Sequence, residues 1–434
     1  MIIAPSVAYD MTRLATRVMN RTPNGIDRID MAFAQHFIGS LSKDDLGLMM
    51  TLLGPRVITS EGARDIVDGI SNNWREDEDP YQGSVYGRIV DSIAGDPTNS
   101  YVGKRISSGC KSRAAAVLRW LGQHGFPIGR SPVQALPQGA VYLNVSQFPL
   151  WVSSYFHWLK RRPDVKPVFF IHDLLPIEMP EYFRRSEYER HGRRLRNLAN
   201  FGAGAIVTTQ VVRVALERHL SLLGRSEMPI LVAPIPASPV FSRHDPRDPR
   251  LAKHPYFIIC GTIEPRKNHL MLLHVWRELA LRYGSAAPKL IIVGTRGWEN
   301  ENVVDLLERC KALREHVIEV SGLSTPCFKR LLAGARALLM PSFGEGYGLP
   351  FVEAQAANVP VIASDIPVFR ETGGDRVTFI SPIDGEKWLK TISAFAFQYP
   401  AYLDMRGGEA EPQSSLNWDI YFSKVEKFLA TLKG

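Results

Sequence analysis

The chain has 434 residues, of which 45% are hydrophobic and 22% are charged, which is ordinary for a soluble globular protein. This length suits two domains of roughly 150–250 residues each. The 52 Lys and Arg residues outnumber the 44 Asp and Glu residues, giving a formal net charge of +8. Such an excess favours anionic partners such as nucleotides, phosphates or an acidic membrane face, although solubility alone also accounts for it.

Several protein classes are excluded by these first observations. Every apolar run is far shorter than the ~20 residues of a membrane-spanning helix. The first ten residues lack a basic region followed by a long apolar core, so we expect no secretory signal. The four cysteines (Cys110, Cys260, Cys310 and Cys327) show no paired spacing, which predicts neither a disulfide framework nor a zinc site and fits a reducing cytoplasm.

The N-terminal half contains short apolar runs that predict a parallel sheet. A turn at 21–28 (RTPNGIDR) precedes a predicted helix over 27–37. The region 72–108 has no clear pattern, and we interpret it as an insertion with loops. The predicted strands cover 140–145, 168–171, 205–208 and 230–233. A helix over 186–200 is expected, with Ser186 as its N-cap and Gly202 after its end.

The C-terminal half alternates strands and helices more regularly, after a predicted linker at 242–253. The predicted strands cover 256–260, 289–293, 317–320, 337–340 and 360–363. The predicted helices cover 268–283, 303–313, 326–335 and 350–357. This alternation predicts a doubly wound parallel sheet, whose ligands bind outside the carboxyl ends of the strands. A final amphipathic helix over 416–433 is expected to dock on one of the domains.

The glycine-rich segment 343–353, with the sequence FGEGYGLPFVE, is the strongest motif. It follows a predicted strand and enters a predicted helix. Three of its residues allow tight turns and close approach of a ligand: Gly344, Gly346 and Gly348. Because Pro350 suits a first helical turn, the amides around Gly348 and Leu349 form a predicted anion site that the helix dipole reinforces.

Two carboxylates in this segment, Glu345 and Glu353, stand eight residues apart. They could accept hydrogen bonds from hydroxyls at opposite ends of one ligand, such as those of a sugar and those of a ribose. The alternative is a solvated loop followed by an ordinary first-turn glutamate, which the helix dipole also favours.

A second motif, GTIEPRKN at 261–268, follows the first strand of the C-terminal half. Arg266 and Lys267 project from a loop at the ligand edge of the sheet, where two adjacent cations suit a diphosphate. A solvated loop at a helix start is the alternative. Since this loop and the glycine-rich loop emerge on the same edge of one sheet, each interpretation supports the other.

Two weaker signals lie in the N-terminal half. His172 and Asp173 end a buried strand, where His172 could hydrogen-bond a sugar hydroxyl and Asp173 could orient it or contact an acceptor. A structural role for such a histidine is the commoner case. Gly25 would let the backbone approach a ligand and Arg28 could meet a phosphate, but a simple turn is the preferred interpretation there.

An arginine cluster lies on or beside the predicted helix 186–200. Its members are Arg184, Arg185, Arg190, Arg193, Arg194 and Arg196. It would attract anionic lipid or a lipid-linked pyrophosphate. The alternative is a solvated face that is partly paired with Glu187 and Glu189.

Taken together, these motifs resemble glycosyltransferase family 4, the retaining enzymes of the GT-B fold. The segment 261–268, Gly294 after its strand and the Glu345-to-Glu353 spacing carry the resemblance, which covers the C-terminal half almost throughout. The N-terminal half resembles a bacterial subgroup of mannosyltransferase-like enzymes of surface polysaccharide assembly, through DMTRL at 10–14, GIDR at 25–28 and HDLLP at 172–176.

The resemblance implies a fold of two Rossmann-like α/β domains facing across a cleft. The implied boundaries are 1–245 for the acceptor-side domain, 246–414 for the nucleotide-sugar domain and 415–434 for a helix crossing back to the first domain. Two departures stand out. An arginine that often follows the first strand of the second domain is replaced by Thr262, and the 72–108 insertion has no counterpart that we can match.

The same resemblance implies residue roles. Glu353 would bind the donor ribose, and Glu345 with the backbone of Gly346, Tyr347 and Gly348 would hold the donor sugar. Arg266 and Lys267, helped by the Leu349 amide, would hold the diphosphate. His172 would lie against the transferred sugar, and Gly25 would lie close to the phosphates.

The implied activity is retaining transfer of a hexose, with GDP-mannose as the expected donor. The expected acceptor is a lipid-linked saccharide, with polyprenyl diphosphate as the expected carrier. No cofactor, metal or nucleic acid is expected. Asp77 and Asp79 match the letters of an Asp-x-Asp metal motif, but they stand in a polar insertion away from any strand end. The expected location is the cytoplasm, including the inner face of the membrane.

Three other classes remain as alternatives. A related enzyme, such as a nucleotide-sugar epimerase or a phosphorylase, could share the fold, although no pyridoxal-binding lysine is identifiable. A non-catalytic nucleotide-sugar binder is disfavoured by the intact set of charged motif residues. A NAD-dependent dehydrogenase ranks last, because no Gly-x-Gly-x-x-Gly follows a first strand with an acidic residue downstream.

Overall fold

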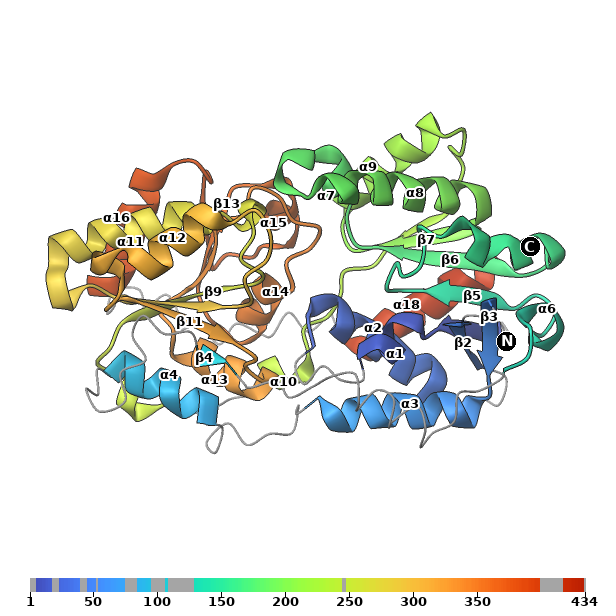
Figure 1. Cartoon of the computed structure of the whole chain (residues 1–434), viewed down its shortest axis with the longest axis horizontal. Helices are drawn as coiled ribbons and strands as arrows, with labels where there is room; N and C mark the ends of the chain where they lie inside the picture. The colour runs from blue at the N-terminus through green and yellow to red at the C-terminus, as the bar shows by residue number, and fades with distance from the viewer. Residues whose placement is uncertain are drawn as a thin grey trace.

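Two α/β domains lie side by side in the computed structural model (Figure 1). The structure describes residues 5–17, 23–39, 45–51, 54–74, 84–94, 106–107, 129–243, 247–398 and 417–432. Within these residues each domain is built on one seven-stranded sheet with helices on both faces.

The N-terminal sheet has the strand order β3-β2-β1-β5-β6-β7-β8. Its strands are β1 (Val7–Asp10), β2 (Leu46–Thr51), β3 (Gly54–Ile58), β5 (Val141–Asn144), β6 (Lys166–Ile171), β7 (Gly204–Val207) and β8 (Ile230–Val232). All neighbouring pairs are parallel except β2 and β3, which are antiparallel at the sheet edge. The predicted parallel sheet is therefore present, with one antiparallel edge strand in addition.

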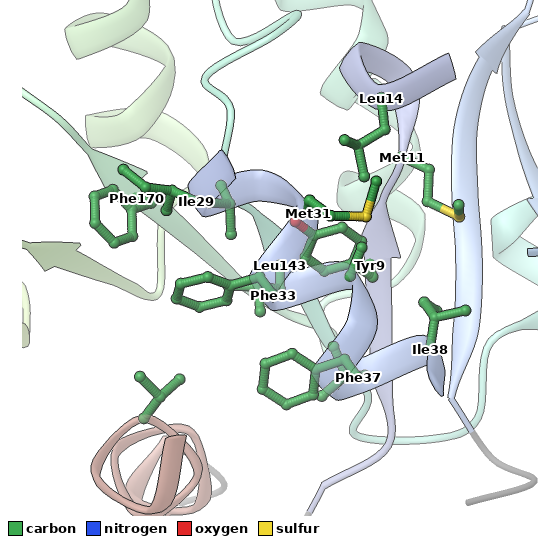
Figure 2. Close-up of a cluster of buried hydrophobic side chains, with 14 of the residues drawn as sticks. Tyr9, Met11, Leu14, Ile29, Met31, Phe33, Phe37, Ile38, Leu143 and Phe170 are labelled. Carbon is green, nitrogen blue, oxygen red and sulfur yellow. The ribbon is translucent and has the colours of Figure 1, made fainter. Parts of the chain in front are cut away.

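Alternate residues of the N-terminal strands enter two separate cores, because successive side chains of a strand point to opposite faces. Phe169 packs with helices α8 (Arg185–Phe201) and α9 (Gln210–Leu222), and with the 3-10 helix η1 (Ser153–Arg161). Phe170 packs on the other face with helices α1 (Thr12–Arg17), α2 (Gly25–Gly39) and α3 (Ser60–Asn73). Figure 2 shows part of this second core, where Phe33 and Phe37 of α2 lie beside Tyr9 of β1.

The C-terminal sheet has the order β14-β13-β12-β9-β10-β11-β4 and is parallel throughout. Its strands are β9 (Tyr256–Cys260), β10 (Lys289–Val293), β11 (Val317–Ser321), β12 (Leu338–Met340), β13 (Val361–Ser364), β14 (Val377–Ile380) and β4 (Ile106–Ser107). The helices of one face are α11 (His269–Tyr283), α12 (Glu301–Arg309) and α16 (Gly385–Phe397), and those of the other include α4 (Ser84–Ala94), α13 (Thr325–Gly334) and α14 (Leu349–Ala356). The doubly wound arrangement is thus confirmed.

The region 72–108 contains regular structure that the sequence did not predict. Residues 84–94 form α4, and Ile106 and Ser107 form β4, which pairs with β11 at the edge of the C-terminal sheet. Ile89 and Val90 of α4 are fully buried in the same core as β9 and β11. This part of the predicted insertion therefore packs on the C-terminal sheet, although it precedes most of the N-terminal strands in the chain.

The C-terminal helix α18 (Trp418–Thr431) lies in the N-terminal core. Its buried face includes Phe422 and Val425, and Phe422 meets Phe33 of α2 with ring centroids 5.2 Å apart. In Figure 2 this helix is seen nearly end-on below the phenylalanines of α2. The chain therefore crosses between the domains on either side of the α4–β4 segment, again between β8 and β9, and once more before α18.

Some local predictions differ from the structure. Ser186 is not the N-cap of α8, because the helix already begins at Arg185 with Arg184 in the cap position. Helix α2 begins at Gly25, two residues before the predicted start, so Gly25 belongs to the helix rather than to a turn. No described helix is long and apolar enough to cross a membrane.

The packing of α4 generates a stability prediction. Ile89→Ala should lower the free energy of unfolding by about 2–5 kcal/mol, because it leaves a cavity in the C-terminal core. Asp91→Ala, on the same helix, is the control and should lower the free energy of unfolding by less than about 1 kcal/mol. Asp91 is only half-buried, and its Oδ1 lies 3.8 Å from Arg250 Nη1. Both free energies of unfolding are measured by chemical denaturation. Equal decreases in the two variants would contradict the packing of α4 on the C-terminal sheet.

Candidate active site

The two predicted motif loops meet at the carboxyl edge of the C-terminal sheet. After β9 the chain passes Gly261 and forms the 3-10 turn η4 (Pro265–Lys267). Asn268 then adopts a left-handed conformation, with φ of 56°, before α11. Its side-chain amide donates to the carbonyls of Pro341 at 3.2 Å and Pro382 at 2.8 Å. The cation-bearing turn is therefore tied to the loops that follow β12 and β14.

The glycine-rich loop follows β12 and enters α14. Gly348 is the N-cap with φ of 87°, a left-handed conformation that L side chains rarely adopt, and the helix begins at Leu349 with Pro350 in its first turn. The backbone N–H of Phe343 donates to the carbonyl of Arg266 at 2.9 Å. The two loops thus form one continuous surface, as their common sheet edge predicts.

The carboxylate of Glu345 joins both predicted cations. Lys267 Nζ lies 2.6 Å from Glu345 Oε1, and Arg266 Nη1 lies 2.8 Å from Oε2. Ser342 Oγ also donates to Oε1, at 2.7 Å. Glu345 is only 8% exposed, so its charge is held by direct partners rather than by bulk water.

The electrostatics of this group keep all three charges in place. Burial by itself raises the pKa of Glu345, but the opposing charges of Arg266 and Lys267 bring that pKa down to about 2. Burial lowers the pKa of Arg266, and the nearby Glu345 and Glu264 more than reverse this effect. The arrangement is a buried, fully ionised cluster at the ligand edge of the sheet.

Glu353 lies one turn into α14 and has a different partner. Arg28 of α2 reaches across from the N-terminal domain and places its Nη1 2.5 Å from Glu353 Oε1. Burial raises the pKa of Glu353, and Arg28 opposes this shift. The second oxygen, Oε2, is buried without a hydrogen-bond partner in the described part of the chain. Glu353 therefore retains an acceptor atom for a ligand hydroxyl.

The N-terminal domain approaches the glycine-rich loop closely. A Cβ atom on Gly346 would lie 2.3 Å from the carbonyl oxygen of His172, so only glycine fits this contact. Thr208 Oγ1 donates to the carbonyl of Gly346 at 3.1 Å, and the hydroxyl of Tyr347 donates to the carbonyl of Ile235 at 2.6 Å. A Cβ on Gly25 would meet the Leu349 side chain at 3.0 Å. The sequence-predicted residues of both domains therefore converge on one place.

His172 is held as a neutral imidazole. Burial is the main cause that lowers its pKa, to about 4. Its Nε2 lies 2.9 Å from the carbonyl oxygen of Val145, and since a carbonyl only accepts, Nε2 carries the proton. The other nitrogen, Nδ1, is then an acceptor, which suits contact with a hydroxyl group.

The remaining sequence predictions fall in different places. Among the described residues, no group of three His, Cys, Asp or Glu side chains could hold a metal ion. Asp77 and Asp79 lie outside the described residues. Thr262 packs against Gly297, where a Cβ atom on the glycine would lie 2.6 Å from the Thr262 methyl group.

Comparison with known proteins places this geometry in a family. Residues 242–396, which carry both motif loops, match the model of the family described as glycosyl transferases group 1. The C-terminal domain is a group 1 glycosyltransferase domain. Its match covers the sheet edge at which Arg266, Lys267 and Glu345 converge.

Curated proteins that are similar to this chain include two mannosyltransferases of Escherichia coli. The serotype-specific mannosyltransferase WbdA of Escherichia coli is 34% identical over 183 residues, which is 42% of this chain and 21% of WbdA. The O-antigen chain mannosyltransferase B of Escherichia coli is 34% identical over 217 residues, 50% of this chain and 49% of that protein. The chain thus spans half or less of the length of these relatives.

The fold has a solved counterpart. HepE from Anabaena, whose crystal structure contains UDP-glucose, superposes with a TM-score of 0.54 over 81% of this chain and 96% of that chain. Its sequence identity is 16%, so the likeness concerns the fold. This likeness and the two facing parallel-sheet domains together identify the predicted GT-B architecture.

Two residues of the cluster were not predicted from the sequence. Ser342 donates to Glu345, and Glu264 Oε1 lies 2.5 Å from Arg266 Nη2. Both stand within or next to the quoted motifs, so their position was a usable signal. Nothing in the sequence, however, distinguished a partner of the charged residues from an ordinary loop residue.

The ionised state of Glu345 predicts a pH dependence of stability. Because its folded pKa of about 2 lies below its ordinary 4.5, its contribution is fully present above pH 4.5 and is lost as the pH falls toward 2. This contribution is on the order of 3 kcal/mol. The free energy of unfolding of Glu345→Gln should therefore lie below that of the wild type near neutral pH, and the gap should narrow below about pH 4.5. Denaturant titrations between about pH 7 and 3 measure this difference in the free energy of unfolding. A difference that stays constant over this range would contradict the ion pairs of Glu345.

Proposed function

We propose that the chain is a retaining glycosyltransferase that moves a hexose from a nucleotide-sugar donor to a saccharide acceptor in bacterial surface polysaccharide synthesis. The observation that carries this proposal is the convergence of Arg266, Lys267 and Glu345 beside the N-terminus of α14. The names of the Escherichia coli relatives, both mannosyltransferases, favour mannose as the sugar and GDP-mannose as the donor.

Two cations and a helix N-terminus form a suitable site for the donor diphosphate. Lys267 supplies a compact charge, Arg266 supplies a planar fork, and the amides at Gly348 and Leu349 point out of the first turn of α14. In the donor-free chain, Glu345 takes the place of the anion. On donor binding, the diphosphate replaces Glu345 as the partner of Lys267, and the freed carboxylate accepts hydrogen bonds from the sugar hydroxyls.

The nucleoside and the sugar fit on either side of this diphosphate. Glu353 accepts the ribose hydroxyls with its unpartnered Oε2, while Arg28 remains paired with Oε1. On the other side the sugar lies beside the contact of Gly346 with His172, where the Nδ1 of His172 accepts a sugar hydroxyl.

The transfer keeps the anomeric configuration. The bond between the anomeric carbon and the phosphate oxygen breaks, and its electron pair goes to the phosphate, which the fixed cations and amides stabilise. The acceptor hydroxyl forms the new bond to the anomeric carbon from the face that the phosphate leaves, and its proton passes to a phosphate oxygen. Contact between the domains excludes water, which limits hydrolysis of the donor.

A peripheral contact with an anionic membrane suits a lipid-linked acceptor. Residues 184–227 contain nine arginines and four glutamates, with no Lys or Asp. On this face, α8 and α9 border a hollow of about 510 Å³ whose lining includes Tyr188, Leu222 and Arg193. Leu222 is 78% exposed. Exposed apolar side chains among arginines fit a bilayer interface that contains acidic headgroups.

Vesicle binding tests this membrane contact. Leu222→Asp should reduce co-sedimentation with phosphatidylglycerol vesicles several-fold, because it adds a negative charge to the apolar part of the surface. Leu281→Asp is the matched control, since Leu281 is a 69% exposed leucine on α11 of the other domain, and it should bind like the wild type. Equal binding by both variants would remove this face from the proposal.

The activity itself is tested by a thermal-shift screen of nucleotide sugars, followed by product analysis with the most stabilising one. The expected result is a new glycosidic product on a mannose-containing acceptor, with the donor's anomeric configuration kept. Release of free nucleotide and a changed sugar without any acceptor would identify an epimerase. Binding without turnover would identify a nucleotide-sugar binding protein.

Lys267→Ala tests the diphosphate site. The variant should fold but lose transfer activity by roughly a hundredfold or more, because one charge that stabilises the departing phosphate is gone. Lys390→Ala is the control, since Lys390 is exposed on α16 and pairs only locally, with Glu386. The measurement is the initial rate of transfer with the donor that the thermal-shift screen selects. A fully active Lys267→Ala variant would refute the role of Lys267 at the diphosphate.

A further inference from the structure

Arg194 of α8 differs from Arg190 and Arg193 on the same helix. Arg190 lies 2.5 Å from Glu187, and Arg193 lies 3.7 Å from Glu189. In the described part of the chain, Arg194 forms no such pair with a carboxylate. It is also partly enclosed, and its Nε is buried without a hydrogen-bond partner. Glu187 and Asp173 act on it electrostatically, but neither forms a direct ion pair with it. A cation removed from water without a direct partner is unfavourable, so its position calls for a physical reason.

The direct neighbours of Arg194 do not neutralise it. Its Nη1 lies 2.7 Å from Nε2 of His191 and donates weakly to Oε1 of Gln147, at 3.4 Å. The Nδ1 of His191 lies 3.0 Å from the carbonyl oxygen of Glu187, so Nδ1 carries the proton and Nε2 accepts from Arg194. Burial lowers the pKa of His191 to about 4, which is consistent with a neutral ring. Arg194 thus keeps a full positive charge.

A second buried donor without a partner lies beside Arg194. Gln147 is 5% exposed, and its Nε2 has no hydrogen-bond partner in the described part of the chain. The residue follows β5 with φ of 58°. The loop that carries it is fixed from α8, because Asn197 donates to the carbonyl of Leu150 at 2.7 Å and Arg194 lies over the Trp151 ring at 5.2 Å. The two donors are therefore held together before any ligand arrives.

The position of this pair is on the acceptor side of the candidate active site. Gln147 and His172 both follow strands of the N-terminal sheet at its carboxyl edge, and His172 is bonded to Val145 in the same loop. Asp173 interacts electrostatically with Arg194 on one side and with Arg266 on the other. Arg194 thus acts on the same carboxylate as the donor-side Arg266 but belongs to the other domain.

We propose that Arg194 and the Gln147 amide form an oxyanion subsite that binds an anionic group of the acceptor, a phosphate or a carboxylate close to the attacking hydroxyl. An oxyanion supplies the direct ion-pair partner that Arg194 lacks and accepts from both unpartnered donors. The assignment to the acceptor rests on the proposed transferase function, whereas the binding of an oxyanion does not. The consequence is specificity: acidic or phosphorylated acceptors are preferred to neutral ones.

A binding experiment tests the subsite without any transfer. Inorganic phosphate is titrated calorimetrically into the full-length Lys267→Ala chain, in which the donor site is weakened. Adding Arg194→Gln should weaken phosphate binding at least tenfold. Adding Arg193→Gln, a neighbouring arginine exposed on the same helix, should leave the affinity unchanged. Phosphate affinity that is equal in the two double variants would overturn the proposal.

Acceptor kinetics then distinguish the two sources of the anion and a purely structural role. In the otherwise wild-type chain, Arg194→Gln should raise KM at least tenfold for either a hexose-phosphate or a methyl-glucuronide acceptor, whichever the wild type prefers. The KM for the donor and the rate with a neutral methyl mannoside should stay unchanged, and Arg194→Lys should recover part of the loss. Equal loss with charged and neutral acceptors, or a large fall in melting temperature in both Arg194 variants, would mean that Arg194 only supports the 145–151 loop.

The two proposals can fail separately. Phosphate binding that depends on Arg194, in a chain that transfers no sugar from any nucleotide donor, would end the proposed function and keep the subsite. Sugar transfer with acceptor KM values that do not depend on Arg194 would end the subsite and keep the function.

Discussion

One buried carboxylate holds the candidate active site together. Glu345 lies at the point where the loop after β9 meets the loop after β12, and it pairs with Lys267 from one oxygen and with Arg266 from the other. Without it, two cations would remain in a partly dehydrated position, with Glu264 as the remaining ion-pair partner of Arg266. Under the proposed function, this internal anion keeps the two cations extended and close together, as a diphosphate site requires.

The second requirement is that the two domains meet tightly, and small residues make this possible. Gly346 has no room for a side chain against His172, and Gly25 lies against Leu349 at the start of α14. The Arg28–Glu353 ion pair crosses the same interface. Under the proposed function, donor recognition is therefore shared: the C-terminal domain contributes the cations and carboxylates, and the N-terminal domain contributes His172 and Arg28.

The sequence predicted the C-terminal domain well because its buried parallel strands are short apolar runs with glycine or proline at their ends, as in 256–260. It also predicted that Lys267 and Glu345 share a sheet edge, but not that they bind each other, because spacing cannot say which charges pair in the absence of a ligand. The strand β4 has only two residues and no periodicity to detect. Arg194 was not distinguishable from its neighbours, since only its contact with Gln147 and its lack of a direct ion pair separate it from Arg190 and Arg193.

A crystal structure of the chain with the most stabilising nucleotide sugar tests the central claim directly. The account predicts the diphosphate within hydrogen-bond distance of Lys267 and the Leu349 amide, with Glu345 moved from the lysine to the sugar and Glu353 on the ribose. A nucleotide bound elsewhere, or one bound while Lys267 and Glu345 remain paired, would contradict it.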